Sequence, residues 1–153
     1  MKAVSAEEAV ALIPNGATVM VGGFMGVGTP ERLLDELVRQ RKSELTIISN
    51  DAAVPGQGVG TMVEEGKRRI ELDGKSFLLE TALRSDFALI HAFLADYLGN
   101  LTYALTARNF NPVMAMAADT VIVTAEHIVP VGVIAPDHVV TPAPLVDYLI
   151  ANG

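Results

Sequence analysis

A glycine-rich turn between a strand and a helix constrains the fold of this chain more than any other feature of its sequence. Residues 17–21 are apolar apart from Thr18 and rich in β-branched side chains, which predicts a short buried strand. Thr29 and Pro30 predict a helix start, because a hydroxyl caps the first turn and proline needs no N–H at the first helical position. The helix is expected to run to about residue 42 with one apolar face. Four glycines lie between the two elements: Gly22, Gly23, Gly26 and Gly28.

Such a turn leaves backbone N–H groups accessible at the positive end of the helix dipole, where an anionic ligand can approach. An acidic protein can therefore hold an anionic cofactor without a basic patch. Two other interpretations remain open. In one, the glycines serve only the packing of a tight turn. In the other, Gly26-Val27-Gly28 and Asp51 form a nicotinamide-dinucleotide site, although Glu31 stands where that fingerprint requires a third small residue.

The rest of the chain alternates between helix and strand patterns. Ser5 and Glu8 form a capping box that predicts a helix over residues 6–13. Asp73-Gly74 predicts a two-residue hairpin turn that places Ile70 opposite Phe77. Further strands are expected over 45–49, 87–93 and 120–124, and further helices over 111–118, capped by Asn111, and over 144–150. This alternation predicts a single α/β domain over residues 1–153, a doubly wound, mostly parallel sheet with a small β-hairpin.

Composition excludes several classes of function. The net charge of −7 argues against nucleic acid as a partner, because phosphate contacts need clustered Lys and Arg. The absence of cysteine excludes disulfides, a thiol nucleophile and a thiolate metal site. No apolar run approaches the roughly 18 residues of a membrane-spanning helix, and the start of the chain has no signal-peptide core. We therefore expect a cytoplasmic protein with no metal site.

Ligands in such sheets bind beyond the carboxyl ends of the strands, so three loops are candidates: Gly22–Gly28, residues 50–60 and residues 96–100. Other polar groups have simpler explanations. Glu64-Glu65 is typical of a solvated helix start, and Arg108, Asn109 and Asn111 are typical of helix capping, with a site role as the alternative. His91 is expected in the core, and His127 and His138 at the surface or in turns.

The run from Asn15 to Pro30 resembles the alpha subunit of family I coenzyme A transferases, with Asn-Gly, three apolar residues, Gly-Gly-Phe and Gly-x-Pro in order. The resemblance extends over nearly the whole chain. Residues 63–67, 72–75, 107–112 and 136–142 are similar to the acetate/acetoacetate (3-oxoacid) branch.

The resemblance implies the NagB/RpiA/CoA transferase-like fold and a cytoplasmic enzyme of short-chain fatty acid metabolism. It implies transfer of coenzyme A between a short-chain acyl-CoA, of the acetyl-CoA or acetoacetyl-CoA type, and a carboxylate. The route would be ping-pong through a glutamyl-CoA thioester on a partner beta subunit, in an α2β2 assembly. This chain would supply no catalytic residue and hold no permanent cofactor. Its expected contribution is the coenzyme A site: Gly22, Gly23, Phe24, Met25, Gly26, Val27 and Gly28.

The chain departs from the family between Gly60 and Thr61, where members carry several tens of further residues. That stretch would hold another βα unit and a Gly-x-Gly-Gly-Phe loop implied to form the oxyanion hole. Either the protein lacks the segment or the printed sequence omits it. If the deletion is real, a non-catalytic assembly subunit becomes an alternative, beside the nicotinamide-nucleotide module.

Overall fold

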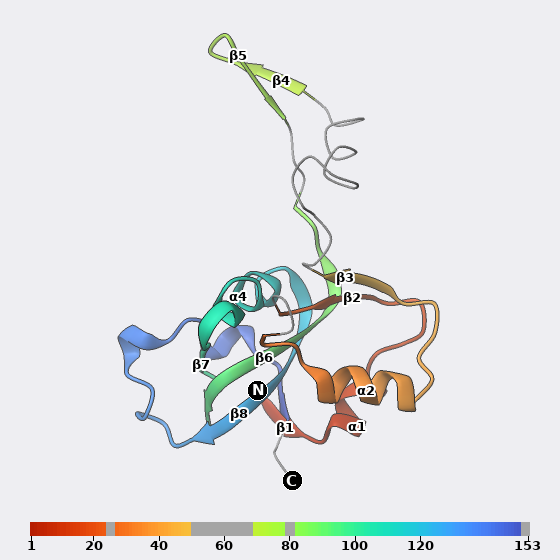
Figure 1. Ribbon diagram of the computed structural model, residues 1–153, viewed down its shortest axis with the longest axis vertical. Coiled ribbons are helices and arrows are strands. Elements are labelled where there is room, and N and C mark those ends of the chain that lie inside the picture. Colours follow the sequence, from red (N-terminus) through yellow and green to blue (C-terminus); the bar gives the residue numbers. More distant parts are fainter. Residues whose placement is uncertain (24–26, 50–68, 79–81, 151–153) are drawn as a thin grey trace. The chain divides into compact units, whose positions relative to one another are not determined.

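The computed structural model describes residues 1–23, 27–49, 69–78 and 82–150 (Figure 1). It divides into two units, one formed by Met1–Asn50 with Arg84–Gly153 and the other by Asp51–Leu83. Each unit is described by itself. The candidate site lies in the first.

The first unit is built on a sheet that has, within the described residues, seven strands in the order β1-β9-β8-β6-β2-β3, with β7 beside β6. Neighbouring strands pair in parallel except β7, which is antiparallel to β6. The predicted mostly parallel α/β sheet is therefore confirmed. The strands are β1 (Lys2–Val4), β2 (Thr18–Val21), β3 (Thr46–Ser49), β6 (Ser85–Asp96), β7 (Leu101–Thr102), β8 (Ala118–Val129) and β9 (Tyr148–Ile150).

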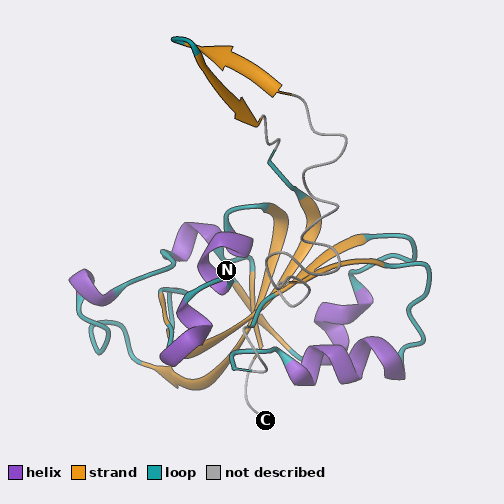
Figure 2. Ribbon diagram, turned by 45° about the horizontal axis from the view of Figure 1, so that its top comes forward, coloured by secondary structure: helices purple, strands orange, loops and turns teal. Residues whose placement is uncertain are grey.

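Helices cover both faces of this sheet (Figure 2). On one face, α1 (Ala6–Ala11) and α2 (Glu31–Arg39) share a buried core with Leu89 of β6. On the other face, α4 (Asn111–Ala115) shares a second core with Ile90, the next residue of β6. Because successive strand residues point to opposite faces, a strand buried on both sides must be apolar throughout. The predicted doubly wound arrangement is therefore confirmed.

Two local predictions are confirmed in detail. Ser5 Oγ accepts a hydrogen bond from the N–H of Glu8 at 3.1 Å, and Glu8 Oε2 accepts one from the N–H of Ser5 at 2.9 Å, so the capping box forms. In the second unit, β4 (Arg69–Leu72) and β5 (Lys75–Leu78) form the hairpin with Ile70 opposite Phe77. Asp73 and Gly74 have φ of +52° and +71°, as the predicted turn requires.

The predicted closing helix over 144–150 is wrong. A short 3₁₀ helix, η3 (Ala143–Leu145), is followed by β9, which inserts between β8 and β1. Asp147 links these neighbours, because its carbonyl accepts the N–H of Lys2 at 2.7 Å and its carboxylate accepts the N–H of Val121 at 2.8 Å. Strand pairing on both sides overrides the weak local helix pattern.

The two central strands are longer than predicted, and this creates the edge on which the candidate site lies. β6 and β8 remain paired from Ser85–Ala118 to Asp96–Val129, beyond the expected ends at residues 93 and 124. β2 ends at Val21, opposite Leu89, so the second half of β6 extends past the carboxyl end of β2. Among the described residues, no helix combines the length and the apolar character needed to cross a bilayer.

Candidate functional site

The glycine turn begins where β2 stops. The N–H of Gly22 still donates to the carbonyl of Leu89 at 2.9 Å, after which Gly23 takes a φ of +125°. Gly28 has a φ of +73°, and α2 starts three residues later. These conformations favour glycine. Phe24, Met25 and Gly26, which complete the predicted coenzyme site, lie outside the described residues.

The helix start differs from the prediction by one residue. Pro30, not Thr29, is the N-cap residue of α2, and no side chain among the described residues caps the helix. Thr29 instead uses its carbonyl, which accepts the N–H of Glu31 at 2.9 Å. The acidic side chain of Glu31 lies in the first helical turn, where the helix dipole favours a negative charge.

Asn111 holds the turn against the sheet. Its side chain is fully buried, and its Oδ1 accepts the N–H of His91 at 3.1 Å. Its Nδ2 donates to the carbonyls of Gly28 at 3.2 Å and Ala107 at 2.9 Å. The expectation that Asn111 caps a helix is wrong, because the N-cap residue of α4 is Phe110 and Asn111 stands inside the helix. Its amide links its own helical segment to two segments that are distant in sequence, the glycine turn and β6.

This packing explains two of the glycines without a ligand. A Cβ on Gly22 would overlap Oδ1 of Asn111, and a Cβ on Gly28 would overlap the Cβ of Ala107. The packing interpretation of the turn therefore accounts for Gly22 and Gly28. The two glycines do not keep space free for a ligand, because Asn111 and Ala107 fill that space. A ligand at this turn would contact the backbone that Asn111 holds in place.

Beside the turn lies a cavity of about 320 Å³, here called the turn pocket. Its polar lining is Thr29, Glu31, His91 and Glu126, and its apolar lining includes Val27, Phe93 and Leu105. The residues come from the turn, the start of α2, β6, β8 and the 3₁₀ helix η1 (Leu105–Arg108). The pocket is at the small end of the range for ligand sites.

His91 is not the core residue expected from its place on a strand. It is half-buried and lines the turn pocket. Its Nδ1 lies 2.9 Å from Oγ1 of Thr124, whose hydroxyl is 3.4 Å from the carbonyl of Ile90. If that hydroxyl donates to the carbonyl, Nδ1 carries the ring proton and donates it to the hydroxyl oxygen. Nε2 is then the acceptor atom of the ring, and it lies 3.9 Å from Oε1 of Glu126. Burial lowers the pKa of His91, and the nearby Glu126 carboxylate opposes this only in part.

The sequence did not single out Glu31 and Glu126. Glu126 lies two residues beyond Thr124 on β8, and Thr124 pairs with His91 of β6, so the strand register brings the three together. Two carboxylates and a neutral imidazole make the pocket an acceptor of hydrogen bonds. It therefore suits an uncharged ligand part with N–H groups better than a phosphate.

The candidate loop over residues 96–100 has a structural role. Asp96 is buried at the end of β6, and its Oδ1 accepts the N–H groups of Leu98, Gly99 and Asn100 at 2.9–3.0 Å. Its Oδ2 accepts Nδ2 of Asn100 at 2.8 Å. Burial alone would raise the pKa of Asp96, but these hydrogen bonds outweigh it and keep the pKa below its usual value.

The other candidates lie apart from the turn. Arg108 and His138 line a separate cavity of about 350 Å³, and His127 is exposed with its ring edge-on to Phe93 at 5.8 Å. Glu64, Glu65 and the loop over residues 50–60 are outside the described residues. In the part of the chain that the structure describes, no three His, Cys, Asp or Glu side chains gather to hold a metal.

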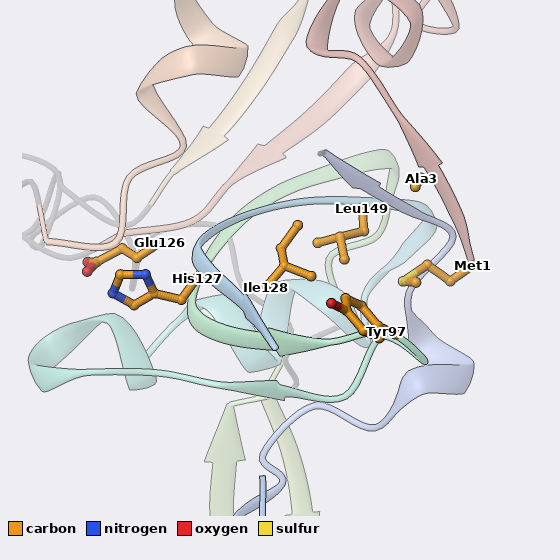
Figure 3. A pocket seen from close by; sticks show the side chains of 7 residues that line it. All are labelled: Met1, Ala3, Tyr97, Glu126, His127, Ile128 and Leu149. Carbon is orange, nitrogen blue, oxygen red and sulfur yellow. The ribbon is translucent and has the colours of Figure 1, made fainter. Parts of the chain in front are cut away.

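The largest of these three cavities, about 510 Å³, shares only Glu126 with the turn pocket (Figure 3). It opens beside β1, β8 and β9, with Tyr97 and Met1 at one end and Glu126 and His127 at the other. Gly28 and Thr29 line the turn pocket instead. The turn pocket is therefore the better candidate site.

Comparison with known proteins identifies the family of the chain. The chain matches the sequence profile described as Coenzyme A transferase over residues 3–58 and 54–152. It is 36% identical to the alpha subunit of the acetate CoA-transferase of Escherichia coli K12, over 213 aligned positions that cover 99% of this chain and 97% of that one. It is 33% identical to the corresponding subunit of the 3-oxoadipate CoA-transferase of Pseudomonas putida, covering 96% and 91% of the two chains.

Solved structures share the fold. An acyl-CoA transferase from Escherichia coli O157:H7, in a thioester complex with coenzyme A, aligns with a TM-score of 0.77 and 20% identity over 99% of this chain and 47% of that one. Glutaconate coenzyme A-transferase from Acidaminococcus fermentans aligns with a TM-score of 0.75 and 15% identity over 98% and 75%. The sequence match and the relatives' names together show that the chain belongs to the coenzyme A transferase family, as an alpha-type subunit of a hetero-oligomeric enzyme.

Proposed function

We propose that this chain is the coenzyme-binding subunit of an enzyme that moves coenzyme A between a short-chain acyl-CoA and a carboxylate. The observation that carries the proposal is the glycine turn, which is fixed by Asn111 in front of α2 and borders the turn pocket. The relatives named for acetate, 3-oxoadipate and acetoacetyl-CoA:acetate/butyrate support a carboxylate and acyl-CoA pair.

The proposed coenzyme site is Gly22–Gly28, with Phe24, Met25 and Gly26 included on sequence alone. We expect backbone N–H groups of the turn to bind an anionic part of the coenzyme. The carboxylates of Glu31 and Glu126 repel phosphate, so the uncharged, amide-bearing arm is the part that fits the turn pocket. The nucleotide then lies outside the pocket.

The proposed nucleophile is a glutamate of the beta subunit. Its carboxylate attacks the acyl-CoA carbonyl and releases the coenzyme A thiolate, leaving a mixed anhydride. The thiolate attacks the glutamyl carbonyl, the acyl group leaves as a carboxylate, and a glutamyl-CoA thioester remains. The incoming carboxylate then attacks this thioester, and the same steps run in reverse to form the new acyl-CoA. Glu31 and Glu126 of this chain are exposed, whereas such a nucleophile needs a desolvated site with oxyanion donors.

Trapping tests this division of roles. The chain assembled with its cognate beta subunit is incubated with acyl-CoA and then borohydride, which reduces a thioester to an alcohol, and both chains are analysed by mass spectrometry. We expect one modified glutamate, on the partner. Replacing Glu64 or Glu65 with Gln should leave turnover nearly unchanged. A modified glutamate on this chain would overturn the assignment.

We also propose that the chain lacks a segment between Gly60 and Thr61. The alignment with the Escherichia coli alpha chain spans 213 positions, 60 more than the 153 residues here, and the two profile matches meet near residues 54–58. An intact mass of 16.2 kDa is expected for the chain as printed. A larger mass would show that the protein carries the segment. Sedimentation of the assembled enzyme tests the proposed α2β2 stoichiometry.

A further inference from the structure

Arg108 lines a cavity and has no partner for its charge within it. Its guanidinium forms no hydrogen bond and no ion pair with any residue that the structure describes. In the same part of the chain, neither η1, which Arg108 ends, nor α4 has a side-chain cap, so the expected capping role does not explain it. The cavity of about 350 Å³ is here called the arginine pocket, and its lining includes Leu94, Ile134, Val140, Arg108, Asp137 and His138.

The segment after β8 that forms part of this pocket is fixed to β7 and the residues that follow it. The N–H of Val140 donates to the carbonyl of Leu101 at 2.9 Å, and the N–H of Leu101 donates to the carbonyl of Thr141 at 2.9 Å. The hydroxyls of Tyr103 and Thr141 lie 2.7 Å apart, and both side chains are buried. This frame forms without a ligand, so little conformational entropy is lost when one binds.

The charges of the arginine pocket favour one class of ligand. Asp137 and His138 belong to the 3₁₀ helix η2 (Pro136–His138), and neither forms an ion pair with Arg108. With a neutral imidazole the charges of Arg108 and Asp137 cancel, so the pocket does not suit a dianion such as phosphate. A guanidinium binds a single carboxylate through two parallel hydrogen bonds, and apolar walls favour a hydrocarbon chain.

We propose that the arginine pocket binds a small monocarboxylate, with its carboxylate on Arg108 and its short apolar chain against Ile134 and Val140. The volume is at the small end of the range for ligand sites, which suits a ligand of this size. The turn pocket does not suit it, because Glu31 and Glu126 would repel a carboxylate. The inference needs neither the beta subunit nor acyl transfer, since every group that it uses belongs to this chain.

NMR titration of butyrate into the full chain tests the proposal. The parent should bind butyrate, and Arg108→Gln should raise the dissociation constant about tenfold or more, because the charge-assisted hydrogen bonds are lost. Arg41→Gln is the matched control: it removes the same charge from an exposed arginine that lines none of the three cavities, and it should leave the dissociation constant unchanged. Butyramide, which is uncharged and of similar shape, should bind about tenfold more weakly than butyrate.

Two further variants sharpen the test. Asp137→Asn removes the like charge from the pocket and should lower the dissociation constant for butyrate several-fold. Arg108→Lys serves if Arg108→Gln does not fold, and it should still weaken binding, because an ammonium group cannot form the two parallel hydrogen bonds.

Four results would overturn the proposal. They are no saturable binding of butyrate to the parent, an equal dissociation constant for the parent and the Arg108 variants, equal affinity for butyramide, and tighter binding of inorganic phosphate than of butyrate. Because the titration contains no beta subunit and no acyl-CoA, failure of the transfer reaction would not change any of these measurements.

Discussion

Two connections at the carboxyl ends of neighbouring strands use their polar groups in opposite ways. After β6, the carboxylate of Asp96 accepts four hydrogen bonds from its own loop, three at Oδ1 and one at Oδ2. After β2, the turn receives its support from Asn111, a residue from another part of the chain, and its own backbone borders a pocket. The N–H groups that Asp96 accepts are not free to bind a ligand, whereas a turn supported by another segment can keep its own N–H groups for a ligand. Position at a strand end alone therefore does not identify a binding loop.

The largest effect is expected for Asn111→Asp, which removes the hydrogen bonds by which Asn111 braces the turn from another part of the chain. The new carboxylate would be buried and one oxygen would face the carbonyls of Gly28 and Ala107. We expect a loss of about 3–4 kcal/mol in the free energy of unfolding and weaker coenzyme A binding. Urea denaturation and calorimetry measure the two quantities. Full coenzyme A affinity in a folded variant would show that the brace is not needed.

Asp96→Ala should separate stability from binding. It leaves the buried N–H groups of the loop without their acceptor, and we expect a loss of about 2–3 kcal/mol with coenzyme A affinity unchanged. Asp119→Ala, at an exposed position on β8, is the control and should change neither. Weaker coenzyme A binding in Asp96→Ala would place this loop in the site.

Gly28→Ala tests the packing explanation of the turn. Gly28 and Gly132 both have positive φ, but a Cβ meets Ala107 at Gly28 and open space at Gly132. Gly132→Ala should cost about 1 kcal/mol for the backbone alone, and Gly28→Ala about 1–3 kcal/mol more. Thermal melting compares the two variants. Equal losses would mean that Ala107 moves aside without cost.

The smallest effect concerns pH. Burial lowers the pKa of His91 in the folded chain below the unfolded value of 6.5. Between the folded and the unfolded pKa, the unfolded state therefore binds more protons than the folded state. The stability that neutral His91 contributes is present above pH 6.5 and is lost as pH falls towards the folded pKa. His91→Gln should flatten the dependence of unfolding free energy on pH below 6.5. An unchanged slope would mean that His91 protonates equally in both states.

Local signals predicted the elements whose residues are close in sequence. The Ser5–Glu8 capping box, the Asp73-Gly74 hairpin and the strand–turn–helix over residues 17–38 each depend on neighbours a few positions apart. β9 was missed because its three residues are fixed by strands on both sides rather than by their own pattern.

For the same reason, only part of the candidate site could be predicted from the sequence. The turn itself carries a sequence signal, but Asn111 lies 83 positions from Gly28 and 20 from His91. The approach of His91 to Glu126 depends on the register of β6 against β8. Aligning residues 87–93 with 120–126 as neighbouring parallel strands would have placed both side chains on one face.

The central claim, that the turn after β2 binds coenzyme A, is tested most directly by calorimetric titration of coenzyme A into the assembled enzyme. We compare the parent with Gly26→Val and with Gly16→Val, which puts the same side chain at a positive-φ glycine with open space before β2. The account predicts binding to the parent, a clear loss in Gly26→Val and parent-like affinity in Gly16→Val. Tight binding of NADH with no response to coenzyme A, or equal coenzyme A affinity in all three proteins, would contradict it.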